Sequence, residues 1–352
     1  MTPQILIQKI TECFKWRKER RETFTGLVIG LIDQGNVHHH AMSRGLQTRG
    51  SLSSKQERIR RFFAYQTIDS SCLAKALIQM VCQDIPKMDL LLDRTNWMFG
   101  KQSINCLVLA VRIGSMTFPL FWSLLPHSGC SDFAQRKELL DRFQATFGFQ
   151  CIRSFAADRE FIGGQWMQYL FDHQIPFMIR IKDNRLVDYG EQHPKKIKEF
   201  LVSLGEGDER ILYKLLSERH LTIVAKQLKN GENLVICSNH TDPKRILQLY
   251  QKRWDIERCF KNMKTQGFNL EQTHMTLLDR LNKLMAMIAT AILICSFIGL
   301  ALSAPFKRTV SSPLYSFFTR GFRRMKWLLI DAHPHFLALF KSAQLALSKS
   351  EG

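Results

Sequence analysis

Three carboxylates, far apart in the sequence, are the residues most suited to chemistry in this chain. Asp93 ends the apolar run MDLLLD, and Asp158 follows a second apolar run, Cys151–Ala157. If these runs are neighbouring central strands of one sheet, both aspartates lie at one edge, where a following helix can add Glu257. Hard divalent cations prefer oxygen ligands, commonly a few carboxylates completed by phosphate and water. The pattern therefore predicts a divalent-metal site.

The helix expected around Glu257 carries cations on the same face as this carboxylate. At about 100° per residue, Tyr250, Arg253 and Lys264 project within about 40° of Glu257. An adjoining apolar stripe would pack this helix on the sheet, and it consists of Leu249, Ile256, Phe260 and Met263. For an isolated helix, this clustering of cations around Glu257 would indicate ordinary surface salt bridges. The two upstream aspartates instead favour a functional role for this face.

Apolar periodicity predicts the elements that position these residues. The expected order is β-β-β-α-β-α-β, which is that of a ribonuclease-H-like α/β fold with a mixed sheet and flanking helices. Strands are expected at 88–93, 104–113, 116–125, 151–157 and 176–181, with helices at 131–147 and 161–173. Strands at 211–216, 221–227 and 233–238 would form a β-rich insertion, with Asn230-Gly231 as a hairpin turn. Asp242-Pro243 then begins a helix that runs to about Gln266.

These elements divide the chain into five expected regions. They are a helical basic DNA-binding region (1–84), the first part of the catalytic domain (85–183), the β-rich insertion (184–239), the last part of the catalytic domain (240–304) and a basic C-terminal region (305–352). Other acidic residues are interpreted as surface or helix-cap positions, namely Asp89, Asp132, Asp141 and Glu160.

The spacing Tyr250-x₂-Arg253-x₃-Glu257-x₆-Lys264 resembles the Y-R-E-K signature of the insertion-sequence-four group of bacterial DDE transposases. The segments Asp93–Trp97 and Ala157–Phe161 resemble the two aspartate motifs of that family. The resemblance covers about residues 85–300, is weak over 1–70 and has no motif after 305.

This resemblance implies an activity and a role for each matching residue. Asp93, Asp158 and Glu257 would bind two Mg²⁺ ions, with Mn²⁺ able to substitute, for cleavage at transposon ends and strand transfer into target DNA. Arg253 and Lys264 would contact phosphates near the cleaved end, supported by Tyr250.

The resemblance also implies partners, namely double-stranded DNA with terminal inverted repeats, target DNA and a second copy of the chain in the end-paired complex. Hairpin-forming relatives hold a flipped base with a tryptophan in the insertion. Residues 184–239 contain no Trp, which argues against the hairpin route, and Trp254 is the stacking candidate.

The charge balance agrees with a polyanionic partner. The 352 residues include 50 Lys and Arg against 31 Asp and Glu, a formal net charge of +19. Nucleic acid is the commonest such partner, and an anionic membrane surface is the competing interpretation. Because the excess is spread along the chain, it predicts a long surface groove rather than a disordered arm. Ser54 and Glu57 are expected to form the capping box of a helix whose arginines contact DNA.

One segment, Leu284–Ala304, carries no charge over 21 residues and is long enough to span a bilayer. Its many small residues, and the absence of a second such segment, favour a buried core helix and no membrane association. Nine scattered cysteines without a CxxC pair, and the lack of a signal peptide, indicate a reduced cytoplasmic protein, here bacterial and nucleoid-associated when bound to DNA.

Two further functions remain as alternatives to a transposase. One is a ribonuclease-H-like DNA nuclease without strand transfer, which would share the carboxylates but have no need of the Y-R-E-K face. The other is a catalytically silent, transposase-derived DNA-binding protein, against which the three intact acidic positions argue.

Overall fold

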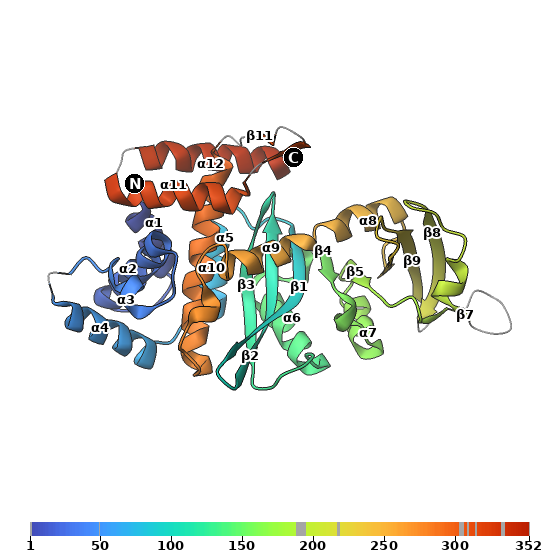
Figure 1. Ribbon diagram of the computed structural model, residues 1–352, viewed down its shortest axis with the longest axis horizontal. Coiled ribbons are helices and arrows are strands. Elements are labelled where there is room, and N and C mark those ends of the chain that lie inside the picture. Colours follow the sequence, from blue (N-terminus) through green and yellow to red (C-terminus); the bar gives the residue numbers. More distant parts are fainter. Residues whose placement is uncertain are drawn as a thin grey trace. The chain divides into compact units, whose positions relative to one another are not determined.

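The protein forms two compact units in a computed structural model that describes residues 2–48, 50–187, 195–216, 219–302, 306–307, 310–313, 315–331 and 335–351. Unit 1 comprises Met1–Pro86, Arg94–Gly129 and Glu257–Gly352, and unit 2 comprises Lys87–Asp93 and Cys130–Ile256. Figure 1 labels the elements of both units.

The N-terminal part of unit 1 is helical, as the sequence predicts. Its helices are α1 (Pro3–Thr11), α2 (Lys18–Gln34), α3 (His39–Ser43), α4 (Leu52–Tyr65) and α5 (Ser70–Val81). The predicted capping box of α4 is wrong, because Ser51 is the N-cap and its hydroxyl accepts a hydrogen bond from the Ser54 amide. Glu57 instead pairs with Arg60 and Arg61.

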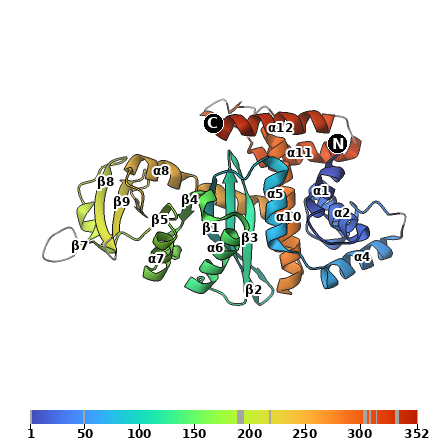
Figure 2. The same cartoon turned by 180° about the vertical axis from the view of Figure 1, so that it is seen from behind.

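The long apolar segment forms α10 (Leu278–Leu300), the core helix of unit 1. It is long and apolar enough to cross a membrane, yet 94% of its most apolar window is buried among other parts of the protein. Figures 1 and 2 show α5 on one side of α10, with α11 (Phe317–Asp331) and α12 (His335–Glu351) at one end. A Cβ on Gly321 would lie 1.7 Å from the Cys295 carbonyl oxygen, so only glycine permits this close crossing of α10 and α11.

The central sheet is mixed, as predicted for a ribonuclease-H-like fold. Its eight strands in the described residues follow the order β3-β2-β1-β4-β5-β10-β9-β8. The pairs β1/β4 and β4/β5 are parallel, whereas β2/β3, β5/β10, β10/β9 and β9/β8 are antiparallel. The strands are β1 (Met88–Phe99), β2 (Gln102–Ile113), β3 (Met116–Leu125), β4 (Ile152–Ala157), β5 (Phe177–Arg180), β8 (Glu209–Leu216), β9 (Arg219–Gln227) and β10 (Asn233–Ser238).

The order β-β-β-α-β-α-β through β5 is confirmed, with α6 (Phe133–Phe147) and α7 (Gly164–Asp172) as its helices. Strand β1, however, does not end at Asp93 but continues to Phe99 and turns at Gly100, whose φ of 57° is left-handed. Asp93 is therefore a mid-strand residue.

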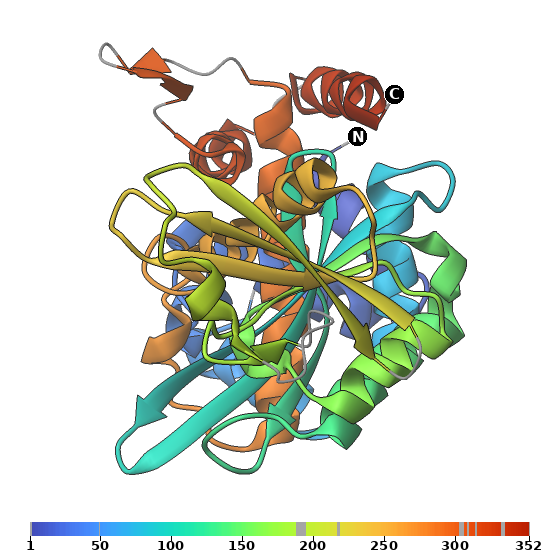
Figure 3. The ribbon, with the colours of Figure 1, turned by 90° about the vertical axis from the view of Figure 1, so that its right-hand side faces the viewer.

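The expected β-rich insertion is present and extends the main sheet. Its strand β10 pairs with β5, and β9 and β8 follow outward. Figure 3 looks at unit 2 with these strands towards the viewer. Smaller elements complete the described chain, namely the two-stranded pairs β6 (Leu186–Val187) with β7 (Lys195–Lys196) and β11 (Phe306–Lys307) with β12 (Val310–Pro313), and the 3₁₀ helices Phe149–Cys151, Arg159–Phe161, Ile197–Phe200 and Leu270–Gln272.

Candidate active site

The two aspartates predicted as metal ligands lie on neighbouring strands of unit 2. Strands β1 and β4 run parallel, and Leu92 is the register partner of Ala157. Asp93 is the next residue of β1 and Asp158 the first residue after β4, so the two residues follow register partners on adjacent strands. Both are half-buried, with 17% of the Asp93 side chain exposed. The predicted placement of the two aspartates beside neighbouring strands agrees with this register, and their joint binding of a metal stays a prediction.

Each aspartate has a defined hydrogen-bond partner. Nη1 of Arg253 lies 3.4 Å from a carboxylate oxygen of Asp93, and Asp158 accepts a 2.8 Å hydrogen bond from the Arg159 amide. The second contact makes Asp158 the N-cap of the 3₁₀ turn Arg159–Phe161. Local backbone geometry therefore fixes the direction of the Asp158 carboxylate.

Arg253 is held between aromatic rings. Its guanidinium carbon lies 5.7 Å from the centroid of the Tyr250 ring and 4.9 Å from that of the Trp254 ring. The Arg253 side chain is only 2% exposed, whereas Trp254 is 49% exposed. A buried, stacked guanidinium is a rigid donor of several hydrogen bonds, and the exposed indole beside it offers a stacking surface.

Tyr250 is buried beside these charges. Burial is the main cause that raises the pKa of Tyr250 to about 12; the charge of Arg253 opposes this rise, the charge of Asp158 adds to it, and Arg180 opposes it. Its phenol therefore remains neutral at physiological pH and contributes as a ring and a hydroxyl, not as an anion.

The helix predicted from Asp242 to about Gln266 is instead two helices, α8 (Pro243–Gln251) and α9 (Trp254–Met263). The turn between them contains Lys252 and Arg253, so the angles expected for one straight helix do not relate Tyr250 to Glu257. Within the second segment, the Arg253 carbonyl accepts from the Ile256 amide, and Glu257 lies about one turn beyond Arg253.

Lys264 is engaged within unit 1. Its Nζ donates a 3.0 Å hydrogen bond to the carbonyl of Asn96 and lies 2.7 Å from a Glu271 carboxylate oxygen. Asn96 belongs to the segment that follows Asp93. The hydrogen bond from Lys264 therefore stabilises the position of that segment. Its predicted contact with DNA phosphate stays a prediction.

Asp89 is a buried residue, close in sequence to Asp93, that the sequence interpretation placed wrongly. The expectation of a surface or cap position is wrong, because Asp89 is fully buried. Its carboxylate accepts hydrogen bonds from Arg153 Nε at 2.9 Å, Ser154 Oγ at 2.7 Å and Lys252 Nζ at 3.0 Å. Since Lys252 lies in the turn between α8 and α9, this cluster ties that turn to β1.

We expect Asp89→Asn to destabilise unit 2 and to shift the turn that carries Arg253. Burial opposes the charge of Asp89, but the hydrogen bonds from Arg153, Ser154 and Lys252 outweigh it and lower the Asp89 pKa. Removing one partner of a buried ion pair costs roughly 3–5 kcal/mol, and less here because Arg153 and Lys252 are about a third exposed.

The measurement is denaturant unfolding of parent and Asp89→Asn at several pH values. A lowered folded-state pKa stabilises the fold above the unfolded value, near 3.9, and this contribution is lost as pH falls through the folded pKa. The difference in unfolding free energy between the parent and Asp89→Asn should therefore be largest at pH 7 and should decrease below pH 4. A gap that is absent at pH 7 would contradict a stabilising role.

The donor set suits a hard divalent cation, although the described residues include no group of three or more His, Cys, Asp or Glu side chains close enough to hold a metal ion. Asp93 and Asp158 follow register partners on adjacent strands, and carboxylate oxygens are the ligands that Mg²⁺ prefers. Glu257 belongs to the other compact unit. The triad of Asp93, Asp158 and Glu257 as metal ligands thus stays a prediction.

Comparisons with known proteins give one family match. Residues 89–294, more than half of the chain, match the family described as "Transposase DDE domain". No curated protein sequence matches the chain. A solved structure, described as a cryo-EM structure of piggyBac transposase synaptic complex with hairpin DNA, is similar with a TM-score of 0.49 at 12% identity, over 97% of this chain and 77% of that chain.

Proposed function

Because this chain belongs to the family of transposase DDE domains, we propose that it cleaves DNA at the ends of a mobile element and joins those ends to target DNA. The observation that carries the proposal is that Asp93 and Asp158 directly follow register partners on the adjacent strands β1 and β4. The buried guanidinium of Arg253 lies beside Asp93. The Y-R-E-K spacing further supports membership of the insertion-sequence-four group.

In this mechanism Asp93, Asp158 and Glu257 would hold two divalent cations, Mg²⁺ or in its place Mn²⁺. Bound cations supply an activated water and neutralise charge on the phosphate during in-line displacement. Arg253 can donate two parallel hydrogen bonds to phosphate oxygens, which orients the scissile group. The neutral Tyr250 ring supports Arg253 from one side, and the exposed Trp254 offers its face to a base that leaves the stack.

The reaction needs no covalent protein nucleophile. Water attacks the phosphodiester at the element end and displaces its 3′-oxygen as a free hydroxyl. That hydroxyl, positioned by the same carboxylates and Arg253, then attacks a target phosphate and displaces the 3′-oxygen of the target strand. Two element ends must act together, so the working form is a homodimer bound to paired ends, the simplest closed symmetry. In this proposal the protein acts in the bacterial cytoplasm, and it is associated with the nucleoid when it is bound to DNA.

We expect the purified chain to join pre-cut ends of its own element to a target plasmid in Mg²⁺. The probe is a pair of DNA duplexes, each carrying one end of the mobile element that encodes this chain. Joined products should form from a complex of two protomers and two ends, measured by sedimentation. Cleavage without joining would support a nuclease instead, and DNA binding without either reaction would support a silent DNA-binding protein. Full joining by one protomer on one end would contradict the dimer.

A further inference from the structure

The turn that follows Asp158 is held by a buried arginine of α6. Asp158 begins the 3₁₀ turn Arg159–Phe161, and the Phe161 amide donates a 3.0 Å hydrogen bond to the Asp158 carbonyl. Nη2 of Arg136 donates a 3.2 Å hydrogen bond to the carbonyl of Glu160, in the middle of this turn. The guanidinium carbon of Arg136 also lies 5.2 Å from the centroid of the buried Phe161 ring. Arg136 therefore contacts the turn through its backbone and through one of its rings.

Arg136 is itself anchored beside the start of α6. Its Nε donates a 3.0 Å hydrogen bond to the hydroxyl of Ser131, and its Nη2 also donates to the Ser131 carbonyl. Ser131 is 4% exposed and Arg136 is 7% exposed, and the next residue after Ser131, Asp132, is the N-cap of α6. One guanidinium thus joins the start of α6 to the turn after β4.

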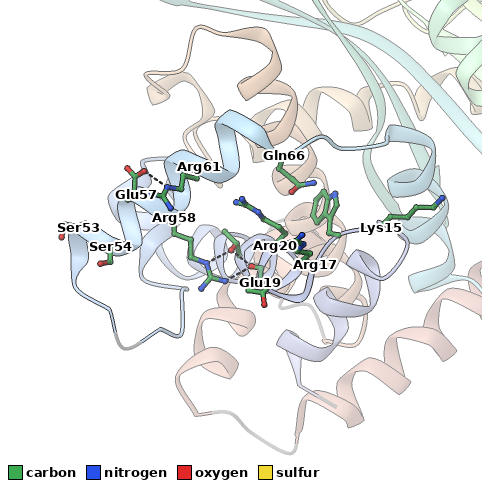
Figure 4. Close-up of a pocket in the computed structure, with 12 residues that line it drawn as sticks. Lys15, Arg17, Glu19, Arg20, Ser53, Ser54, Glu57, Arg58, Arg61 and Gln66 are labelled. Carbon is green, nitrogen blue, oxygen red and sulfur yellow. Dashed lines mark hydrogen bonds and ion pairs between the residues drawn. The ribbon is translucent and has the colours of Figure 1, made fainter.

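This arrangement differs from that of the surface arginines. In the groove lined by α2 and α4, Arg61 pairs with the Glu57 carboxylate at 2.8 Å, and its side chain remains 64% exposed (Figure 4). Among the described residues, the hydrogen bonds of Arg136 all go to uncharged acceptors. Burial lowers the pKa of Arg136 and the nearby charge of Glu160 opposes this, but a guanidinium stays charged at neutral pH. A buried charge costs free energy that an apolar side chain would avoid, which favours a role for its contacts with the turn.

We propose that Arg136 is a positioning residue of the candidate active site, which holds the turn Arg159–Phe161 so that the Asp158 carboxylate is oriented for a divalent cation. The proposal rests on the proposed function, in which Asp158 is a metal ligand. In this role Arg136 acts through the backbone of the turn, whose Arg159 amide donates a 2.8 Å hydrogen bond to the Asp158 carboxylate. Groups that orient the ligands of a metal commonly contribute about 10- to 100-fold to its binding or to activity.

The test variant is Arg136→Lys in the full chain. A lysine keeps a positive charge beside Phe161, which spares the fold, but one ammonium group cannot reproduce the fork that joins Ser131 to Glu160. If thermal unfolding shows that Arg136→Lys is not folded, Ser131→Ala takes its place. This second variant removes only the hydroxyl that anchors Nε of Arg136, and it should give a smaller effect in the same direction.

Two further variants make the comparison specific. Arg142→Lys is the matched control, because Arg142 is a half-buried arginine of the same helix, about 9 Å along its axis, and it pairs with Glu138 at 3.3 Å. Asp158→Asn is the reference for loss of the ligand itself. Mn²⁺ binding to each folded variant, without DNA, is measured from the electron paramagnetic resonance signal of the unbound ion. The Mg²⁺ dependence of cleavage is measured in a single turnover on a duplex that carries an element end.

We expect Arg136→Lys to bind Mn²⁺ at least about tenfold more weakly than the parent. It should also need correspondingly more Mg²⁺ for half-maximal cleavage, with the rate recovering at high Mg²⁺. A loss of folded protein would instead lower the rate at every Mg²⁺ concentration, so this recovery separates positioning from stability. Arg142→Lys should follow the parent in both measurements.

Three outcomes would overturn the positioning role. If Asp158→Asn is weakened while the folded Arg136 or Ser131 variant binds Mn²⁺ like the parent, this inference fails and the proposed function stands. An equal weakening in Arg142→Lys would indicate a general effect of replacing an arginine of α6. Parent-like binding by Asp158→Asn would remove Asp158 from the metal site, so the metal-site part of the proposed function would fail together with this inference.

Discussion

Replacing Asp93 or Asp158 by asparagine, or Glu257 by glutamine, is expected to lower Mg²⁺-dependent DNA cleavage by about a thousandfold or more. Carboxylates that hold divalent cations support several kcal/mol of transition-state stabilisation, and each 1.4 kcal/mol is about tenfold in rate. DNA affinity should be unchanged or slightly higher, because affinity comes mainly from cationic contacts and each change removes one negative charge.

Matched controls exist in unit 2. Asp172→Asn and Glu206→Gln alter exposed acids outside the candidate site and should cleave at the parent rate. Cleavage is followed in a single turnover with Mg²⁺, and affinity by gel shift in EDTA. A near-parent rate for any one of the three site variants would remove that residue from the metal-binding set, while the family assignment would remain.

The sequence was sufficient to predict the elements around this site because their periodicity is local. Continuous apolar runs between turn residues predict strands buried on both faces, and β2, β3, β4 and β5 follow those runs closely. The alternation of strands and helices then places β1 and β4 in parallel. That placement brings Asp93 and Asp158 to the same level.

Other features depend on contacts that no local pattern contains. Asp89 is bonded to Arg153, 64 positions away, and to Lys252, 163 positions away. An aspartate near a strand start looks like a surface residue until these partners are known. The break between α8 and α9 carries no local signal either, since no glycine or proline marks Lys252 as the end of a helix, and its Nζ contacts Asp89.

The structure differs from the sequence-based expectation at two further points, the N-cap of α4 and the end of β1. Ser51, Ser53 and Ser54 all precede or begin α4, and the sequence alone does not determine which hydroxyl caps the helix. Strand β1 extends past Asp93 through the polar residues Arg94–Asn96, which look like a loop until β2 supplies its pairing edge. In the second case a tertiary partner, strand β2, selects the extended conformation.

Arg253 is expected to matter for the rate of cleavage far more than for DNA binding. Its guanidinium is buried, stacked between two rings and 3.4 Å from Asp93, so it can hold a phosphate in a fixed orientation. Arg253→Lys keeps the charge but loses the two-pronged contact. A hydrogen bond to a charged group contributes about 1.5–3 kcal/mol, so the lysine variant should cleave roughly 10- to 100-fold more slowly, and Arg253→Ala more slowly still.

The comparison with Lys264 and Lys244 separates positioning from charge. Lys264→Ala should also slow cleavage, because it releases Asn96 in the segment that follows Asp93. Lys244→Ala removes an exposed cation from the first turn of α8 and should change little. The rates are measured in a single turnover at saturating protein, with thermal midpoints to show that each variant is folded. If folded Arg253→Lys and Lys264→Ala both cleave at the parent rate, the Y-R-E-K residues have a structural role only, and the main evidence for the insertion-sequence-four group is lost.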